Sequence, residues 1–123
     1  MKPGDVILTP VPQADGRIKN RPALILCEMP PYGDFLVCGI STQLHHYVNN
    51  FDEIISPGDE DFTSSGLLEK SLIRLGFLAV LPISRAMGII GSISSERHNR
   101  LLKTLSDYLI RKSAISLETD KRR

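Results

Sequence analysis

The sequence contains no tryptophan and only two cysteines, and its three histidines do not gather near either thiol. Cys27 and Cys38 lack the CxxC spacing of zinc-binding motifs, which argues against a zinc site. Each cysteine instead lies inside an apolar run. We therefore expect two buried, reduced thiols, as in a protein of a reducing compartment.

Long apolar runs and a strong net charge are missing too. No run approaches the ~20 apolar residues that a membrane-spanning helix needs. The opening residues, MKPGDVILTP, become polar too early for a secretion signal. The formal net charge of +1 lacks the basic footprint of many nucleic-acid-binding proteins. The 123 residues suffice for one modest core, and we expect a cytoplasmic protein that does not bind membranes.

Short apolar segments separated by turn-forming residues occupy most of the chain and predict β-strands. The expected strands are residues 4–9, 21–27, 35–41, 51–55 and 88–93, while residues 67–83 form either two strands or one strand bent at Gly76. Residues 10–20 carry two prolines and an Asp-Gly pair, which predict a loop. Residues 56–66 predict an acidic loop with room for one helical turn.

The apolar period changes near the C-terminus and predicts one helix. Ser94 or Ser95 suits the position before its first turn. Its apolar face is expected to consist of Leu101, Leu102, Leu105, Tyr108 and Leu109. The fold class is therefore mostly β with a C-terminal helix, arranged as a small, mostly antiparallel, barrel-like sheet. We expect a single domain at residues 1–112 and a polar, disordered tail at residues 113–123.

The segment KNRPALIL, residues 19–26, places two cations directly before a proline and an apolar run. Pro22 cannot donate a hydrogen bond within a sheet, so it favours the start or the edge of a strand. The apolar run after it suits a strand that is covered on both faces. Arg21 is thereby predicted to lie at a stiff strand start, where a functional group keeps its position.

Four motifs stand in a fixed order between residues 1 and 111: GDVILTPVPQADGRIKNRPALIL, VCGISTQ, GLLEKSLIRL and, before the helix, GIIGSIS. In this order and spacing they resemble the PemK/MazF family, the toxins of bacterial toxin–antitoxin pairs. The resemblance implies an SH3-like barrel of the CcdB/MazF type that forms a homodimer. It also implies cleavage of single-stranded RNA without a metal or cofactor, and a cognate antitoxin whose tail occupies the RNA-binding groove.

Cleavage of RNA without a metal needs a proton acceptor for the 2′-hydroxyl, a proton donor for the departing 5′ oxygen, and positive donors at the phosphate. By resemblance Arg21 is the active-site arginine, whose planar fork can reach two phosphate oxygens. Ser41 is the expected hydroxyl donor, with Thr42 as its alternative, and Gln43 is expected to contact RNA. Arg74 matches a catalytic arginine of the family, and we assign it to phosphate stabilisation because a guanidinium keeps its proton near neutral pH.

Further cations precede the Arg-Pro motif. Arg17 and Lys19 are expected to attract backbone phosphates rather than to take part in the chemistry. The segment that carries them, residues 10–20, is expected to act as a mobile lid over the groove.

The proton acceptor is the part that the sequence does not supply. The resemblance implies an acidic residue two positions after Arg74, but the chain has Gly76 there, followed by a phenylalanine. The remaining candidates are His45 and His46, just beyond the ISTQ motif, and Asp15 in the first loop. Plain solvent exposure is the more ordinary explanation for the two histidines.

Three other functions fit part of the pattern. A degenerate family member would bind its antitoxin or nucleic acid without cutting, and Gly76 is the reason to retain this alternative. A gyrase poison of the CcdB type would share the fold, although the polar end of the chain, without tryptophan, gives it no support. A peptide-binding SH3-like module would need an aromatic groove, and four Phe, three Tyr and no Trp are few for that role.

Overall fold

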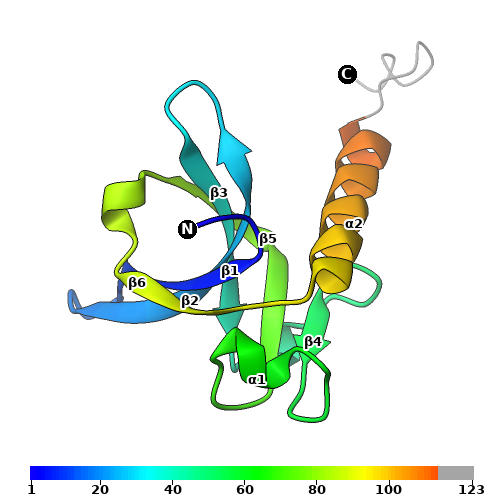
Figure 1. Ribbon diagram of the computed structural model, residues 1–123, viewed down its shortest axis with the longest axis horizontal. Coiled ribbons are helices and arrows are strands. Elements are labelled where there is room, and N and C mark those ends of the chain that lie inside the picture. The colour runs from blue at the N-terminus through cyan, green and yellow to red at the C-terminus, as the bar shows by residue number, and fades with distance from the viewer. Residues whose placement is uncertain (114–123) are drawn as a thin grey trace.

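The computed structural model describes residues 1–113, and residues 114–123 lie outside the described part. The predicted tail at residues 113–123 therefore falls outside it as well, except for Ser113, which ends the last helix. The elements, shown in Figure 1, are β1 (Asp5–Pro12), β2 (Ile18–Met29), β3 (Asp34–Ser41), η1 (Leu44–His46), β4 (Glu53–Ile55), α1 (Phe62–Ser65), β5 (Ser71–Leu81), η2 (Ile83–Arg85), β6 (Gly88–Ser92) and α2 (Ser95–Ser113).

The six strands form one antiparallel sheet in the order β4-β5-β3-β2-β1-β6. The sheet curls into a half-barrel, and α2 stands along one side of it (Figure 1). The short helix α1 lies against the outer strand β6, where the Ser64 hydroxyl donates a 3.0 Å hydrogen bond to the carbonyl of Ser92. A Cβ at Gly91 would overlap the backbone of α1, so this close contact requires glycine. The predicted fold class, mostly β with a C-terminal helix, is confirmed.

The two faces of the sheet carry separate apolar clusters because successive strand residues point to opposite sides. Leu24 and Leu26 of β2 join the larger cluster, to which α2 contributes Leu101 and Leu105. Ala23 and Ile25, which alternate with them along β2, point to the opposite face. They join a smaller cluster there with Ile7, Phe35 and Val37. The expectation that this strand is covered on both faces is therefore confirmed.

Helix α2 is held to the sheet by a buried ionic network. Arg97, only 7% exposed, pairs with Asp61 (2.8 Å), Glu53 (2.9 Å) and Asp59 (3.0 Å). Burial lowers the pKa of Arg97, but the hydrogen bond and charge of Asp61 outweigh burial and raise that pKa above its ordinary value. The carboxylates thus fix the start of α2 beside α1 and β4.

The start of α2 agrees with the sequence, whereas one residue of its expected apolar face does not. The Ser94 hydroxyl accepts a 3.1 Å hydrogen bond from the backbone N–H of Arg97, so Ser94 is the N-cap. Leu101 and Leu105 are buried, but Leu109 is 53% exposed, because its neighbour Tyr108 is the residue that packs inward there, against Phe51 with ring centroids 4.6 Å apart. No helix among residues 1–113 is long and apolar enough to cross a membrane.

The two thiols differ in burial. Cys38 on β3 is buried, as expected, and both cysteines are free. Burial raises the pKa of Cys38 to about 12, and the charge of Asp52 adds to the rise. Cys27 is only half-buried, so the expectation that it is buried is wrong. Its position beside a register shift in the β2–β3 pairing brings it to the margin of the core.

The predicted loop at residues 10–20 is wrong, because β1 and β2 continue as a paired hairpin through most of it. The backbone N–H of Gln13 donates a 2.7 Å hydrogen bond to the carbonyl of Arg17, so these two residues form a hydrogen-bonded pair. In an antiparallel ladder, hydrogen-bonded pairs alternate with pairs that exchange no hydrogen bond. Counting from Gln13 and Arg17, Pro10 and Pro12 fall in pairs of the second kind, where the ladder needs no N–H from them. The prolines are therefore compatible with the hairpin, and the paired segment is not the free loop that was expected to act as a lid.

The start of β2 also differs from the prediction. The strand begins at Ile18 and not at Arg21, so Arg21 lies inside a paired strand opposite Thr9. Pro22 instead precedes the point where pairing with β3 begins, at Ala23 and Gly39.

Strand β5 runs continuously from Ser71 to Leu81 but bends in the middle, which confirms one of the two predicted alternatives. Gly39 pairs with Arg74 and the preceding Cys38 pairs with Leu78, so residues 75–77 have no partner in β3. These three residues are called the β5 bulge below. The buried carboxylate of Asp52 accepts a 3.0 Å hydrogen bond from the freed N–H of Leu75. The bulge is therefore satisfied by a side chain where the ladder is interrupted.

Candidate functional site

The candidate site is a cavity of about 390 Å³ on the sheet face opposite α2, called the groove below. Strands β1, β2, β3 and β5 line it, and its polar lining side chains are Thr9, Arg21, Ser41, Gln43 and Arg74. The alternation of side chains explains the grouping. Thr9 and Arg21 are paired residues of β1 and β2, Gly39 follows on β3, and Arg74 pairs with Gly39 on β5. The register thus carries two arginines from separate strands to one face.

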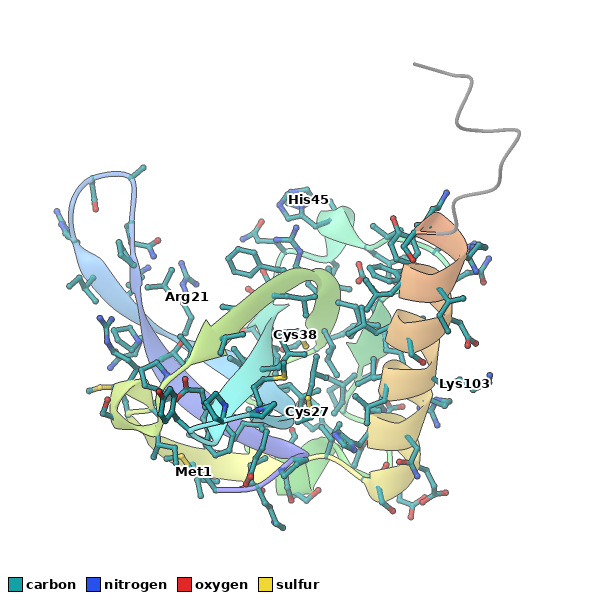
Figure 2. All side chains as sticks on the ribbon, turned by 90° about the horizontal axis from the view of Figure 1, so that it is seen from above. Met1, Arg21, Cys27, Cys38, His45 and Lys103 are labelled. Carbon is teal, nitrogen blue, oxygen red and sulfur yellow. The ribbon has the colours of Figure 1, made fainter. Side chains whose placement is uncertain are left out.

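Arg21 lies on the hairpin side of the groove and is exposed (Figure 2). Its Nη2 donates a weak 3.4 Å hydrogen bond to Oε1 of Gln13, while the Gln13 amide nitrogen donates to the carbonyl of Val11 at 3.0 Å. The hydroxyl of Thr9 lies 3.5 Å from the Arg21 carbonyl. The backbone of Arg21 is thus fixed by the sheet, and its guanidinium remains available to an anionic ligand.

Ser41 ends β3 and is half-buried at the groove wall. Its Oγ accepts a 3.0 Å hydrogen bond from the backbone N–H of Gln43, which turns the chain out of the sheet. The Ser41 hydroxyl keeps its own hydrogen for donation. Thr42, between the two, is exposed and does not line the groove. The geometry therefore favours Ser41 over Thr42 as a groove hydroxyl.

Arg74 is half-buried on β5, directly before the β5 bulge. Its Cζ lies 5.5 Å from the centroid of the Phe77 ring, within the range of a cation–π contact. The ring rests against Gly39, where a Cβ would overlap it. The bulge and the missing side chain at Gly39 together place an aromatic ring beside the second arginine of the groove.

The groove is positively charged. Arg21 and Arg74 are the only ionisable side chains among its described lining residues, with no carboxylate or histidine among them. Two like charges over one apolar cavity repel each other, and an anion between them would relieve the repulsion. The lining is therefore suited to a phosphate group.

The other cations predicted to contact RNA lie outside the groove, on the hairpin. Lys19 is exposed on β2 and, two residues before Arg21, shares its face of the strand. Arg17 lies at the hairpin tip, where it forms a 3.5 Å ion pair with Asp15. The same Asp15 accepts the backbone N–H of Arg17 at 3.0 Å. Asp15 is thus engaged in the turn and does not reach the groove lining.

His45 and His46 also lie outside the groove. Both are exposed on η1, with ring centroids 4.2 Å apart. Figure 2 shows His45 beside the sheet, between the hairpin that carries Arg21 and helix α2. None of the three predicted proton acceptors therefore lines the cavity.

The position that the resemblance assigns to an acidic residue faces elsewhere as well. Gly76 does not line the groove, and a Cβ there would approach the ring of Phe51 at 3.7 Å. A carboxylate at residue 76 would therefore point away from the two arginines in this backbone conformation.

Three residues of the site escaped the sequence reasoning. Thr9 lines the groove beside Arg21, Phe77 lines it beside Arg74, and Asp52 supports the β5 bulge from behind. The glycine before Phe77 indicated a bend, but only the strand register shows where the ring points. Among residues 1–113 no cluster of three His, Cys, Asp or Glu side chains could hold a metal ion.

Comparison with known proteins adds to this geometry. The model of a family described as PemK-like, MazF-like toxins of type II toxin–antitoxin systems matches residues 2–109. The chain has no significant match among curated protein sequences.

Two solved structures share the fold. One is the Mycobacterium tuberculosis toxin MazF-mt6, with a TM-score of 0.60 and 18% identity over 84% of this chain and 93% of that chain. The other is an endoribonuclease in complex with its cognate antitoxin from a mycobacterial species, with a TM-score of 0.61 and 13% identity over 89% of this chain and 94% of that chain.

Proposed function

Since the chain belongs to the family of PemK-like, MazF-like toxins of type II toxin–antitoxin systems, we propose that it is an endoribonuclease that cleaves single-stranded RNA. The observation that carries this proposal is the groove itself, in which two arginines from separate strands and one serine hydroxyl line a single cavity without a carboxylate among its described lining residues. Such a lining favours a ligand with phosphates in a flexible chain. Cleavage of messenger RNA would stop translation and growth.

The proposed reaction is an internal transesterification. The ribose 2′-oxygen attacks the neighbouring phosphorus, the new O2′–P bond forms, and the P–O5′ bond breaks to leave a cyclic phosphate. Arg21 and Arg74 stabilise the negative charge that builds up on the phosphate oxygens, and the Ser41 hydroxyl donates to one of them. Such preorganised donors each contribute roughly 10²–10³-fold to rate. By resemblance to the family, the step needs no metal.

Proton transfer is assigned to no residue of the described lining, because neither arginine accepts a proton near neutral pH. The 2′-proton then leaves to solvent or to a group brought in from outside the groove, and the 5′-oxygen gains a proton in the same way. His45 and His46 are the nearest candidates by sequence, but each would have to move from η1 to act.

The partners follow the same reasoning. We propose a cognate antitoxin, since one structural relative is an endoribonuclease in complex with its antitoxin. We also propose a homodimer, which the exposed apolar side chains between β5 and β6 support. These are Val80, Ile83, Met87 and Ile89, each between 50% and 59% exposed. The cytoplasm, where messenger RNA is translated, is the proposed location.

The absence of an acidic group from the described lining favours one second candidate, a family member that binds antitoxin or RNA but does not cut. One experiment separates the two. The purified protein is incubated with a long single-stranded RNA in EDTA, and the product ends are mapped. Discrete cuts with cyclic phosphate ends support the endoribonuclease, whereas intact RNA together with a measurable affinity for it supports the second candidate. Cleavage that requires a divalent metal contradicts the proposed mechanism.

A further inference from the structure

Phe77 is an aromatic residue that the groove leaves 56% exposed. An aromatic ring on the lining of a cavity can still gain burial when a ligand covers it. The endoribonuclease mechanism described above does not use this ring.

Several features of the chain hold the ring in place. The β5 bulge removes Phe77 from the regular ladder, and Asp52 stabilises the bulge through the N–H of Leu75. Gly39 leaves the space that the ring occupies, since a Cβ there would overlap it. The guanidinium of Arg74 lies 5.5 Å from the ring centroid. The ring is thus oriented by backbone features from two strands rather than left free on the surface.

The neighbourhood of the ring matches the chemistry of an unpaired nucleotide. Single-stranded RNA is bound by stacking its bases on aromatic rings and arginine planes, while its phosphates pair with arginines. Here Phe77 and Arg74 offer the stacking surfaces, and Arg21 with Arg74 offers the charge, all within one cavity. A second copy of the chain is a poorer occupant of this cavity, because an apolar contact would bury two uncompensated arginines.

We propose that Phe77 is the stacking site for an unpaired base next to the phosphate held by Arg21 and Arg74. The inference rests on the proposed function, since it takes RNA as the ligand of the groove. It assigns to Phe77 a role in binding and in the choice of cleavage position, and no role in proton transfer.

The chain offers a clean reporter because it contains no tryptophan. Phe77→Trp places a single indole in the groove, and Tyr32→Trp is the matched control on the 85% exposed turn between β2 and β3. The ligand is a short random-sequence RNA with every 2′-hydroxyl methylated, which removes the nucleophile and prevents cleavage. Inorganic polyphosphate serves as the probe without bases.

The methylated RNA is expected to quench the fluorescence of Phe77→Trp, whereas polyphosphate leaves it unchanged, and the Tyr32→Trp signal is unaffected by either ligand. Phe77→Leu, which keeps an apolar side chain but loses the ring, is expected to bind the RNA roughly 5- to 100-fold more weakly, the range given by base–aromatic stacking. Phe77→Tyr is expected to retain wild-type affinity.

Three results would overturn the stacking site. They are an unchanged affinity of Phe77→Leu for the RNA, bound RNA that does not quench the groove tryptophan, and a loss of dimer rather than of RNA affinity in Phe77→Leu. The outcome is separable from the proposed activity. If the methylated RNA quenches the groove tryptophan but the wild-type protein does not cut the unmodified RNA, stacking is supported and catalysis is contradicted. If Phe77→Leu cuts the unmodified RNA with an unchanged KM, catalysis is supported and stacking is contradicted. A chain that does not bind the RNA at all would contradict both proposals.

Discussion

The buried carboxylate of Asp52 accepts a 3.0 Å hydrogen bond from the backbone N–H of Leu75, the first residue of the β5 bulge. Its second oxygen accepts the N–H of Val48 at 3.0 Å. The bulge lies directly after Arg74 and contains Phe77, so one carboxylate outside the groove supports the irregular backbone between these two groove side chains.

Replacement of this carboxylate is the first test. Asp52→Ala is expected to lower the free energy of unfolding by about 2–4 kcal/mol, because two N–H donors lose their acceptor at a buried position and each loss costs roughly 1–3 kcal/mol. Urea denaturation measures the change. The control is Asp107→Ala, whose carboxylate is exposed and pairs with Lys103, and which is expected to change stability by less than about 0.5 kcal/mol. Equal stability of the two variants would show that Asp52 does not support the bulge.

The ionic network of α2 predicts a dependence of stability on pH. Burial alone would raise the pKa of Asp61, but the hydrogen bonds from Arg97 and from the Ser94 backbone outweigh burial and hold that pKa below its ordinary value. A carboxyl group whose pKa falls on folding stabilises the fold above its unfolded pKa, and this contribution is lost as the pH falls through the folded pKa. Stability is therefore expected to decline below about pH 4, the range in which an unfolded aspartate titrates.

Asp61→Asn tests this coupling. The variant is expected to be less stable at neutral pH by about 3 kcal/mol, near the lower end for a broken buried pair because Glu53 and Asp59 still face Arg97. Its stability is expected to change less between neutral and acidic pH than that of the wild type. Urea midpoints across the pH range measure both effects, with Asp107→Asn as the exposed control. A wild-type acid profile in Asp61→Asn would contradict the assignment.

The thiols predict a difference in chemical reactivity. Cys38 is buried and its pKa is raised to about 12, so it carries almost no thiolate at neutral pH, whereas Cys27 is half-buried. A thiol reagent at about pH 8 is expected to modify Cys27 in the folded protein and to reach Cys38 only after unfolding. Mass spectrometry after digestion identifies the modified residue. Comparable rates at both residues in the native protein would contradict the described packing of β3.

The exposed histidines predict a negative result. His45→Ala and His46→Ala are each expected to leave RNA cleavage within about twofold of the wild type, since a general base contributes roughly 10²–10⁴-fold and neither ring lines the groove. Initial rates across a range of pH provide the measurement. A loss of about 100-fold or more in either variant would mean that η1 closes over the groove during the reaction.

Much of the sheet could be predicted from the sequence because its strands are buried, and burial leaves a readable apolar pattern. The run from Ala23 to Leu26 shows this most clearly, since each residue belongs to one of two clusters. The hairpin at residues 10–20 could not be predicted, because its prolines indicate a loop unless the ladder alternation is known.

The candidate site was predictable where a local motif carried it and unpredictable where distant strands meet. Arg21, Ser41 and Arg74 stand in short motifs, and the strand register brings all three to one cavity. The hydrogen bond of Asp52 to Leu75 spans 23 residues of sequence, and the contact of Phe77 with Gly39 depends on the shift between β3 and β5. Neither leaves a local pattern. The catalytic roles of the three motif residues stay a prediction.

The most direct test of the central claim is RNA cleavage by Arg21→Ala in the presence of EDTA. The matched control is Arg85→Ala, which removes an exposed arginine of η2 outside the groove. If Arg21 stabilises the reacting phosphate, the initial rate is expected to fall at least about 100-fold in Arg21→Ala and to remain at the wild-type level in Arg85→Ala, with both proteins folded. Cleavage by Arg21→Ala at the wild-type rate would contradict the account.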